Sequence, residues 1–323
     1  MLRLLLAAVC AFVWMAAEGR DARAQTWPQK PITLIHGFGA GGNADSISRL
    51  VATALSEQLG VAVIVDARPG AGGNIASDMV ARAAPDGTTI TLLTGGHAVS
   101  AALYRTLKFD PVESFAFVSL IGNFPLVIAT RADSPITDLA GLIATAKAQP
   151  GKLTFSSVGF GSTQHLTGEL LAMSADIKLT HVPYRGGMQP LTDVLGGQID
   201  LIVDTITVTG PAIKAGTLRG LGVSSAEPWP SLPSIAPVAR QLPGFDVRSW
   251  IGIAAPANTP PAVIARLNEA LRATIASSAF QERLDLLGVR AQASSPADMH
   301  DFVAAEIKRW TGVIDRAGVQ RIE

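Results

Sequence analysis

Three glycine-rich stretches contain the residues of this chain whose types and spacing could do chemistry. They run from Gly37 to Asn43 (GFGAGGN), from Arg68 to Asn74 (RPGAGGN) and from Gly159 to His165 (GFGSTQH). The first N–H groups of a helix have no internal partner and carry the positive end of its dipole, so loops that lead into helices can hold an anion. Each stretch ends in residues that favour a helix N-cap, namely Asn43, Asn74, and Ser162 or Thr163.

The first stretch has two interpretations. Gly37, Gly39 and Gly42 form G-x-G-x-x-G after a strand-like run, and Asp66 ends the next such run, which is typical of a dinucleotide-binding loop. The same loop could hold a carboxylate, or each stretch could be an ordinary turn in which glycine supplies positive φ. Three such loops favour a ligand cradle, because open α/β sheets bind ligands beyond the carboxyl ends of their strands.

Sequence motifs for catalysis or metal binding are absent. The chain contains no G-x-S-x-G, no H-E-x-x-H, no Walker loop and no pair of cysteines. His165 and Glu169 are one helical turn apart, but two groups are too few for a zinc site. His97 and His165 could donate to a ligand or be structural, and Asp45 could simply stabilise the first turn of its helix. We therefore expect no enzyme, no metal and no cofactor.

The elements that position these loops follow from hydrophobic periodicity. Strand-like runs alternate with helical patterns, which predicts an α/β fold with parallel sheets and helices on both faces. Apolar residues keep helical spacing from Ile47 to Leu55 and from Ile264 to Ile275. The predicted strands are Ile32–His36, Val61–Asp66, Thr88–Leu93, Phe117–Ile121, Leu126–Thr130, Leu153–Ser157, Lys178–Val182, Leu201–Val203 and Gly220–Val223.

The first 24 residues have the three parts of a secretory signal. Arg3 precedes the apolar run Leu4 to Ala17, and Ala22-Arg23-Ala24 is a small-x-small cleavage site. The apolar run is shorter than the roughly 20 residues needed to cross a bilayer. Cys10 is the single cysteine and lies in this segment, so we expect a mature periplasmic chain without thiols or disulfides.

Charge and size restrict the function further. Residues 1–24 hold three of the 26 basic and two of the 26 acidic residues, so the mature chain is almost neutral and poorly suited to nucleic acid. The remaining 299 residues suit two lobes of up to about 150 residues each. No later apolar run reaches membrane length, so we expect a soluble product.

Two crossings between the lobes are predicted. Five prolines between Glu227 and Pro243 argue against a helix or central strand and predict a long surface crossing. The apolar run from Phe124 to Thr130 is the other candidate. Together they predict a signal peptide over 1–24, a discontinuous lobe 1 over 25–125 and 227–323, and lobe 2 over 126–226.

An ordered series of motifs resembles the Bug family, the extracytoplasmic solute-binding proteins associated with tripartite tricarboxylate transporters. The resemblance covers essentially the whole mature chain. Its motifs are Pro31–Leu34, Gly41–Asp45, Arg68–Asn74, Ala83–Gly87, Leu103-Tyr104, Phe109–Pro111, Pro150–Leu153, Gly161–Thr163 with His165, His181–Gly187, Leu195–Asp200, Ile213–Gly216 and Ala255–Pro260.

The resemblance implies a periplasmic binding protein-like fold, with two α/β lobes joined by a hinge and a ligand cleft between them. It implies that backbone N–H groups and a serine or threonine of the three loops hold a carboxylate, with an aspartate after a strand facing the cleft. The implied ligand-binding residues are Phe38, Gly42, Asn43, Asp45, Gly73, Asn74, Gly159, Gly161, Ser162, Thr163, His165 and Asp204; His97 joins them as a candidate donor.

The first loop departs from the family pattern. Gly37 and Ala40 stand where the family commonly has proline. Because proline restricts φ, their loss predicts a loop that is freer when the cleft is open and costs more to order when it closes.

The predicted function is capture of a small carboxylated molecule, such as a di- or tricarboxylate, an aromatic carboxylate or an acidic amino acid. The expected partners are the membrane permease subunits of a tripartite tricarboxylate transporter, which a monomeric receptor would supply with ligand. One alternative is a sensor that presents its closed form to a membrane signalling protein. A more distant alternative, an NAD-dependent oxidoreductase, depends on the first glycine loop alone, and export argues against it.

Overall fold

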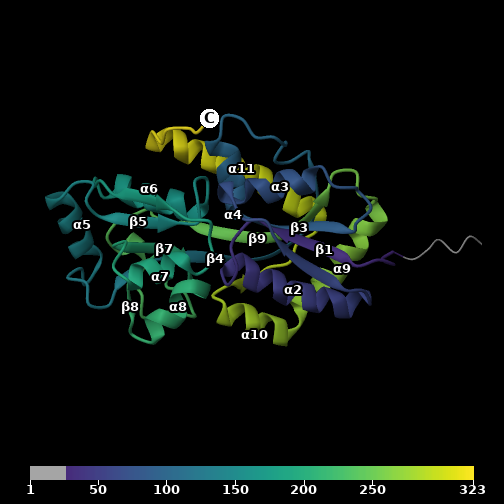
Figure 1. Ribbon diagram of the computed structural model, residues 1–323, viewed down its shortest axis with the longest axis horizontal. Helices are drawn as coiled ribbons and strands as arrows, with labels where there is room; N and C mark the ends of the chain where they lie inside the picture. Colours follow the sequence, from purple (N-terminus) through teal and green to yellow (C-terminus); the bar gives the residue numbers. More distant parts are fainter. Residues whose placement is uncertain (1–26) are drawn as a thin grey trace, which may run out of the picture.

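The computed structural model describes residues 27–323, so the expected signal peptide over 1–24 lies outside the described residues. In this part of the chain one ten-stranded sheet runs through the molecule in the order β2-β1-β3-β9-β4-β7-β5-β6, with β8 and β10 also paired to β4 (Figure 1). The strands are β1 (Ile32–His36), β2 (Val63–Ala67), β3 (Thr89–Thr94), β4 (Phe115–Arg131), β5 (Thr154–Ser157), β6 (Thr180–Pro183), β7 (Leu201–Thr205), β8 (Leu218–Val223), β9 (Arg248–Pro256) and β10 (Arg290–Ala291).

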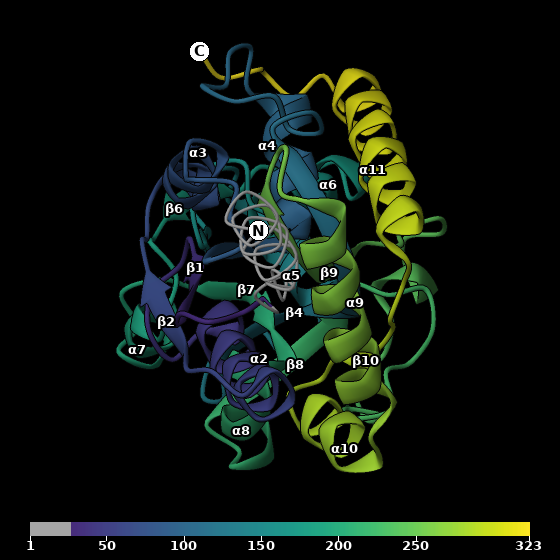
Figure 2. The same cartoon turned by 90° about the vertical axis from the view of Figure 1, so that its right-hand side faces the viewer.

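The helices cover both faces of this sheet. They are α2 (Asn43–Leu59), α3 (Asn74–Ala81), α4 (Gly95–Leu103), α5 (Leu139–Ala148), α6 (Thr163–Ser174), α7 (Gln189–Leu195), α8 (Ile206–Lys214), α9 (Pro261–Ala276), α10 (Ser278–Leu286) and α11 (Pro296–Ala317), with short 3-10 helices η1 (Ala71–Gly73) and η2 (Val238–Arg240). Near β1 and β3, helices α3, α4 and α11 lie on one face and α2, α9 and α10 on the other (Figure 1; Figure 2).

Strand β4 divides the molecule into two lobes. It pairs with β9 from Phe115 to Pro125 and with β7 from Leu126 to Thr130. We call the part built on β1–β3, β9 and β10 the first lobe and the part built on β5–β8 the second lobe. The two strands predicted over 117–121 and 126–130 are therefore one continuous strand, and the two-lobed α/β fold is as expected. The residue ranges given for the lobes stay a prediction.

The hinge brings the two connections between the lobes together. Ser224 donates its backbone N–H to Leu126 O at 2.9 Å, and the Leu126 N–H donates to Ser224 Oγ at 2.8 Å. The Ser224 hydroxyl in turn donates to Val247 O at 2.6 Å. Ser224 is completely buried, so these bonds are shielded from water. One serine thus holds both crossings in register.

The sequence pattern did not predict β9, and this strand changes the character of the sheet. Eight of its nine residues are buried, since it lies in the middle of the sheet with both faces covered. It runs antiparallel to both β3 and β4, whereas β1–β3 and β5–β7 form the expected parallel groups. The sheet is mixed because the chain returns from the second lobe and enters the first lobe from the opposite direction.

The proline-rich segment between residues 227 and 243 also differs from the expected surface crossing. It contains only the short helix η2, as the prolines predict, but Trp229, Leu232, Ile235 and Val238 are buried. Ile235 and Val238 pack on β8 at Gly220 and Gly222, where a Cβ atom would lie 2.6 and 2.7 Å from them. The segment therefore covers one face of the second lobe.

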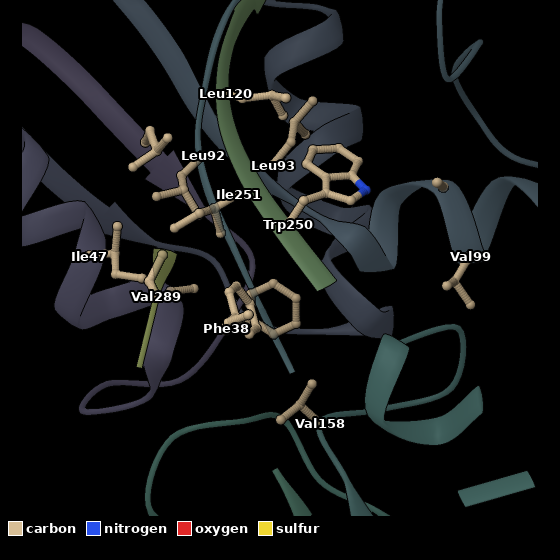
Figure 3. Close-up of a cluster of buried hydrophobic side chains, with 14 of the residues drawn as sticks. Phe38, Ile47, Leu92, Leu93, Val99, Leu120, Val158, Trp250, Ile251 and Val289 are labelled. Carbon is tan, nitrogen blue, oxygen red and sulfur yellow. The ribbon is translucent and has the colours of Figure 1, made fainter. Parts of the chain in front are cut away.

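The main hydrophobic core continues from the first lobe to the second. Figure 3 shows Phe38, from the loop after β1, between Ile251 of β9 and Val158 of the second lobe; all three belong to one buried cluster. A smaller cluster, which includes Val127, Val208 and Trp229, fills the other face of the second lobe. Within the described residues, no helix combines the length and the apolar character that crossing a membrane requires.

Candidate ligand-binding site

A cavity of about 30 Å³ lies where the N-termini of four helices meet. Helices α2 and α4 belong to the first lobe, and α6 and α8 to the second. All four begin directly beyond strand ends or strand-end loops, which is where open α/β sheets place their ligands. The lining residues are Phe38, Gly42, Asn43, Ala44, Thr94, Gly96, Phe124, Val158, Ser162, Thr163, Gln164, Gly186, Gly187, Asp204, Thr205, Val208 and Ser249.

The helix caps differ from those that the sequence predicted. Gly42 and Gly73 are the N-cap residues of α2 and α3, and Asn43 and Asn74 are already helical. Ser162 caps α6 as expected, because its hydroxyl accepts the N–H of His165 at 3.2 Å. Helices α2 and α8 begin without a side-chain cap. Their first N–H groups are therefore left for another acceptor.

Two polar contacts join the lobes beside the cavity. The Asn43 side-chain amide, at the start of α2, donates to Thr207 Oγ1 of α8 at 2.7 Å. The hydroxyls of Thr163, on α6, and Ser249, on β9, lie 3.2 Å apart. The Asn43 side chain is thus a contact between helices of the two lobes and not a cap of its own helix, which is why the cap prediction for it was wrong.

Glycines bring the lobes into backbone contact on two sides of the cavity. Gly39 forms a β-bridge with Gly186, and its N–H donates to Arg185 O at 3.0 Å. On the other side, a Cβ atom on Gly72 would lie 2.4 Å from Phe160 O. The lobes are therefore closed on each other. The first loop packs against protein backbone where a dinucleotide-binding loop would hold a pyrophosphate.

Asp204 is the ionisable group of the cavity wall. Among the lining residues in the described part of the chain, no other side chain is acidic or basic. Asp204 is 3% exposed, and its Oδ1 accepts the N–H of Thr205 at 2.7 Å and the side-chain amide of Gln164 at 3.4 Å. Burial raises the pKa of Asp204 to about 6, although these donors act in the opposite direction.

Asp45 stabilises the first loop through hydrogen bonds and does not line the cavity. Its Oδ2 accepts the N–H of Gly41 at 3.0 Å and the Arg49 Nε–H at 3.1 Å, and its Oδ1 lies 3.4 Å from Nε2 of the buried His36. Burial alone would raise the pKa of Asp45, but the hydrogen bonds from Arg49 and Gly41 outweigh it and lower this pKa. Asp45 therefore stays charged and fixes the loop.

The second glycine loop lies beside the cavity, not in its wall. Gly73, Asn74 and His97 line a separate space of about 10 Å³ next to Gly37 and Phe38. A Cβ atom on Gly37 would lie 2.4 Å from Gly73 Cα. Gly37, which stands where the family commonly has proline, thus permits close packing of the first loop on the second. This constraint involves two loops, so the sequence of either loop alone does not show it.

His97 is held by the first lobe. Its Nε2–H donates to Pro111 O at 2.7 Å, and its ring stacks on Phe109 with a centroid distance of 5.7 Å. Burial lowers the pKa of His97 to about 4, so the ring is neutral near pH 7. The structure places it away from the cavity between the lobes.

The third loop contributes its cap residues to the cavity while its glycines shape the turn. Ser162 and Thr163 line the wall, whereas Gly159 and Gly161 do not. The Ser100 hydroxyl donates a hydrogen bond to Gly161 O at 3.2 Å, which links the loop to the first lobe. The third loop therefore has both a ligand-facing part and a lobe-contacting part.

A histidine pair lies behind the third loop. The rings of His165 and His181 are 4.3 Å apart between centroids, and Phe160 packs edge-on against both. Burial lowers the pKa of His165 to about 3, with a contribution from His181, and burial lowers the pKa of His181 to about 4. His165 is also absent from the cavity wall.

Comparison with known proteins agrees with this architecture. Residues 47–319 match the model of the tripartite tricarboxylate transporter family receptor. The chain belongs to this family. The receptor resembles the solved periplasmic binding protein BugD, with 31% identity and a TM-score of 0.88 over 92% of this chain and 100% of that one. The expected membership of the Bug family is confirmed.

Two further solved relatives carry bound ligands. An adipate-bound protein of Rhodopseudomonas palustris is 34% identical, with a TM-score of 0.88 over 92% of this receptor and all of that protein. MatC from Rhodopseudomonas palustris, with bound malate, is 31% identical, with a TM-score of 0.85 over 89% of this receptor and all of MatC. Both likenesses confirm the periplasmic binding protein fold with two lobes.

Several residues of the receptor's cavity lie outside the three glycine loops that the sequence singled out. Thr94 and Gly96 form a fourth glycine-containing helix start, and Thr94-Gly95-Gly96 after a strand was a visible signal for it. Thr205 follows Asp204 at the start of α8. Ser249 had no local signal, because it lies on β9, the strand that the pattern did not predict.

Proposed function

We propose that this receptor captures a small carboxylated organic molecule between its lobes in the periplasm and delivers it, without chemical change, to the permease of a tripartite tricarboxylate-type transporter. One observation carries the proposal. Four helix N-termini, two from each lobe, meet at one cavity whose described lining contains no lysine, arginine or histidine. Such a site attracts an anion through backbone N–H groups.

Helix dipoles supply the attraction. Each N-terminus is equivalent to about half a positive charge, so four of them outweigh the single Asp204 carboxylate. The N–H groups at the starts of α2 and α8 have no side-chain cap that would compete with a ligand. A carboxylate is therefore a better fit than a neutral solute.

Capture by both lobes explains how binding drives closure. Asn43 of α2 and Thr163 of α6 line the same cavity from opposite lobes. A ligand that contacts both has more contacts in the closed form than in the open one, and only this difference shifts the equilibrium. The permease would then recognise the closed arrangement of the two lobes.

The solved relatives support a carboxylate ligand, because one carries adipate and another carries malate. The closed cavity itself is small. At about 30 Å³ it holds about two water molecules. Even a short carboxylate has more heavy atoms than two waters, so it has to move the lobes slightly apart, and a long dicarboxylate has to keep them further apart.

Thermal unfolding of the purified chain 25–323 with and without ligand tests the proposal. The set should include adipate, malate, succinate, benzoate and glutamate, each beside its uncharged amide as a matched control. A carboxylate at 100 times its Kd should add about 2.7 kcal/mol to the free energy of unfolding, and its amide should add little. Equal shifts with acids and amides, or no shift with any acid, would overturn the proposal.

A further inference from the structure

The chemistry of the cavity wall sets a condition on the ligand beyond its first carboxylate, if the proposed function holds. The four helix starts favour one anionic group. Asp204 then adds a carboxyl to the same wall, and the described lining contains no cationic side chain that would neutralise it. The ligand must therefore present to Asp204 something other than a bare second anion.

The backbone and the packing around Asp204 hold its side chain in the cavity wall. Asp204 is the penultimate residue of β7, where its backbone pairs with Val127 of β4, and its side chain is buried. The Thr205 N–H and the Gln164 amide both donate to Oδ1, and the nearby Thr205 hydroxyl also lowers the pKa of Asp204. Oδ2 makes no hydrogen bond within the described residues. One carboxylate oxygen is thus committed to the protein and the other is left to accept a proton donor.

The elements packed around Asp204 supply no charge of their own to the cavity. Helix α6 contributes Ser162, Thr163 and Gln164, the first lobe contributes uncharged residues such as Asn43, and β4 contributes Phe124. The Asp45 carboxylate, with the buried His36 beside it, lies behind the first loop, outside the lining. The neighbouring Thr205 hydroxyl, which is buried and makes no hydrogen bond in this structure, is a donor in the described wall that a donor on the ligand would have to displace from Asp204.

We propose that Asp204 is the specificity-determining residue of this receptor and selects a short carboxylate that offers a hydroxyl or ammonium donor to its Oδ2. A ligand with a second carboxylate at that position binds only together with a proton. The raised pKa of Asp204 agrees with this, because burial already favours its protonated form.

Substitution by asparagine gives a sharp test because it inverts the polarity of the group. In Asp204→Asn the Thr205 and Gln164 donors hold the amide oxygen, so the amide nitrogen takes the place of Oδ2 and presents a donor to the ligand. Binding should be measured by calorimetry with propanoate, lactate, alanine and succinate. The wild-type chain should bind lactate or alanine at least about tenfold more tightly than propanoate, and the variant should lose this preference and gain affinity for succinate.

Asp301→Asn is the matched control, because it removes the same charge from an exposed side chain on α11. It should keep the wild-type ligand order. An Asp204→Asn variant with unchanged ligand order would overturn the inference and leave the proposed function standing. Absence of binding by the wild-type chain to every carboxylate, these four included, would overturn both.

A second measurement needs no variant and covers the case in which Asp204→Asn does not fold. Calorimetry of the wild-type chain at pH 7.5, in two buffers with different ionisation enthalpies, counts the protons taken up on binding. Succinate should bind with uptake of about one proton, because either Asp204 or the carboxylate that faces it has to be protonated. Lactate should bind with almost no proton uptake. Equal proton uptake for the two ligands would contradict the inference.

Discussion

Gly39 and Gly186 meet backbone to backbone across the boundary between the lobes, where they form a β-bridge. A Cβ atom on Gly39 would lie 2.9 Å from Gly186 O. The two residues belong to different lobes, so this contact exists only when the lobes are closed. Gly39 of the first loop therefore allows the lobes to close, in addition to any contact that this loop makes with a ligand.

Gly39→Ala should weaken ligand binding without destabilising the ligand-free protein. The added methyl clashes with Gly186 only in the closed form, and overpacking of this kind costs about 1–3 kcal/mol, which corresponds to roughly five- to 150-fold in Kd. Calorimetry and the ligand-free Tm measure the two effects. Gly312→Ala, on α11 away from the cleft, should leave Kd unchanged; an unchanged Kd for Gly39→Ala would refute this role in closure.

Removing the charge of Asp204 should stabilise the protein at high pH, because this side chain is buried in the closed arrangement of the lobes. The folded-state pKa is raised from 3.8 to about 6, so the folded state binds more protons between these values and its stability falls as pH rises through this window. Asp204→Asn should therefore add up to about 3 kcal/mol at pH 8 and almost nothing near pH 3.5. Urea unfolding at both pH values checks this, and equal effects at the two would contradict it.

Acid should destabilise the protein through its buried histidines. The pKa values of His97, His165 and His181 are lowered to between about 3 and 4, below the ordinary value of 6.5. The unfolded chain therefore binds more protons, and stability that is complete above pH 6.5 is lost as pH falls towards 4. Each histidine should contribute a slope of up to about 1.4 kcal/mol per pH unit.

Urea midpoints between pH 7 and pH 4.5 measure this slope. His165→Gln should reduce it, because it removes one of the groups that titrate in the unfolded state alone. His300→Gln is the control, since the His300 side chain is half exposed on α11. A slope that His165→Gln leaves untouched would show that other groups control the acid sensitivity.

Loss of the Asp45 carboxylate should disturb the first loop. The carboxylate accepts the Gly41 N–H and pairs with Arg49, and it is 4% exposed. Because hydrogen bonds to a charged group contribute about 1.5–3 kcal/mol, Asp45→Ala should lower the free energy of unfolding by about that amount and weaken ligand binding. Arg49→Ala, which removes an exposed partner, should cost less than about 1 kcal/mol. If Asp45→Ala and Arg49→Ala lowered the free energy of unfolding equally, the ion pair would account for the effect and the hydrogen bond to the first loop would not.

The glycine loops and most strands could be predicted from the sequence because turn and cap chemistry is local. Ser162 as the cap of α6 is an example, since its partner His165 is three residues away. The cavity as a whole could not be predicted in the same way. Asn43 contacts Thr207 across 164 residues, and Ser249 lies on a strand whose apolar run has no alternating pattern because both of its faces are buried.

The sequence by itself determined that this chain has glycine-lined helix starts, an almost neutral charge and the ordered motifs of one receptor family, because these depend on residue type and short-range spacing. Only the tertiary structure decided which helix starts converge. In the folded chain Asp45 lies outside the cavity and stabilises the first loop, whereas Asp204 lies in the cavity wall. Gly37 packs against Gly73. These outcomes depend on how closely distant backbones approach, and that distance is set by the packing of the two lobes.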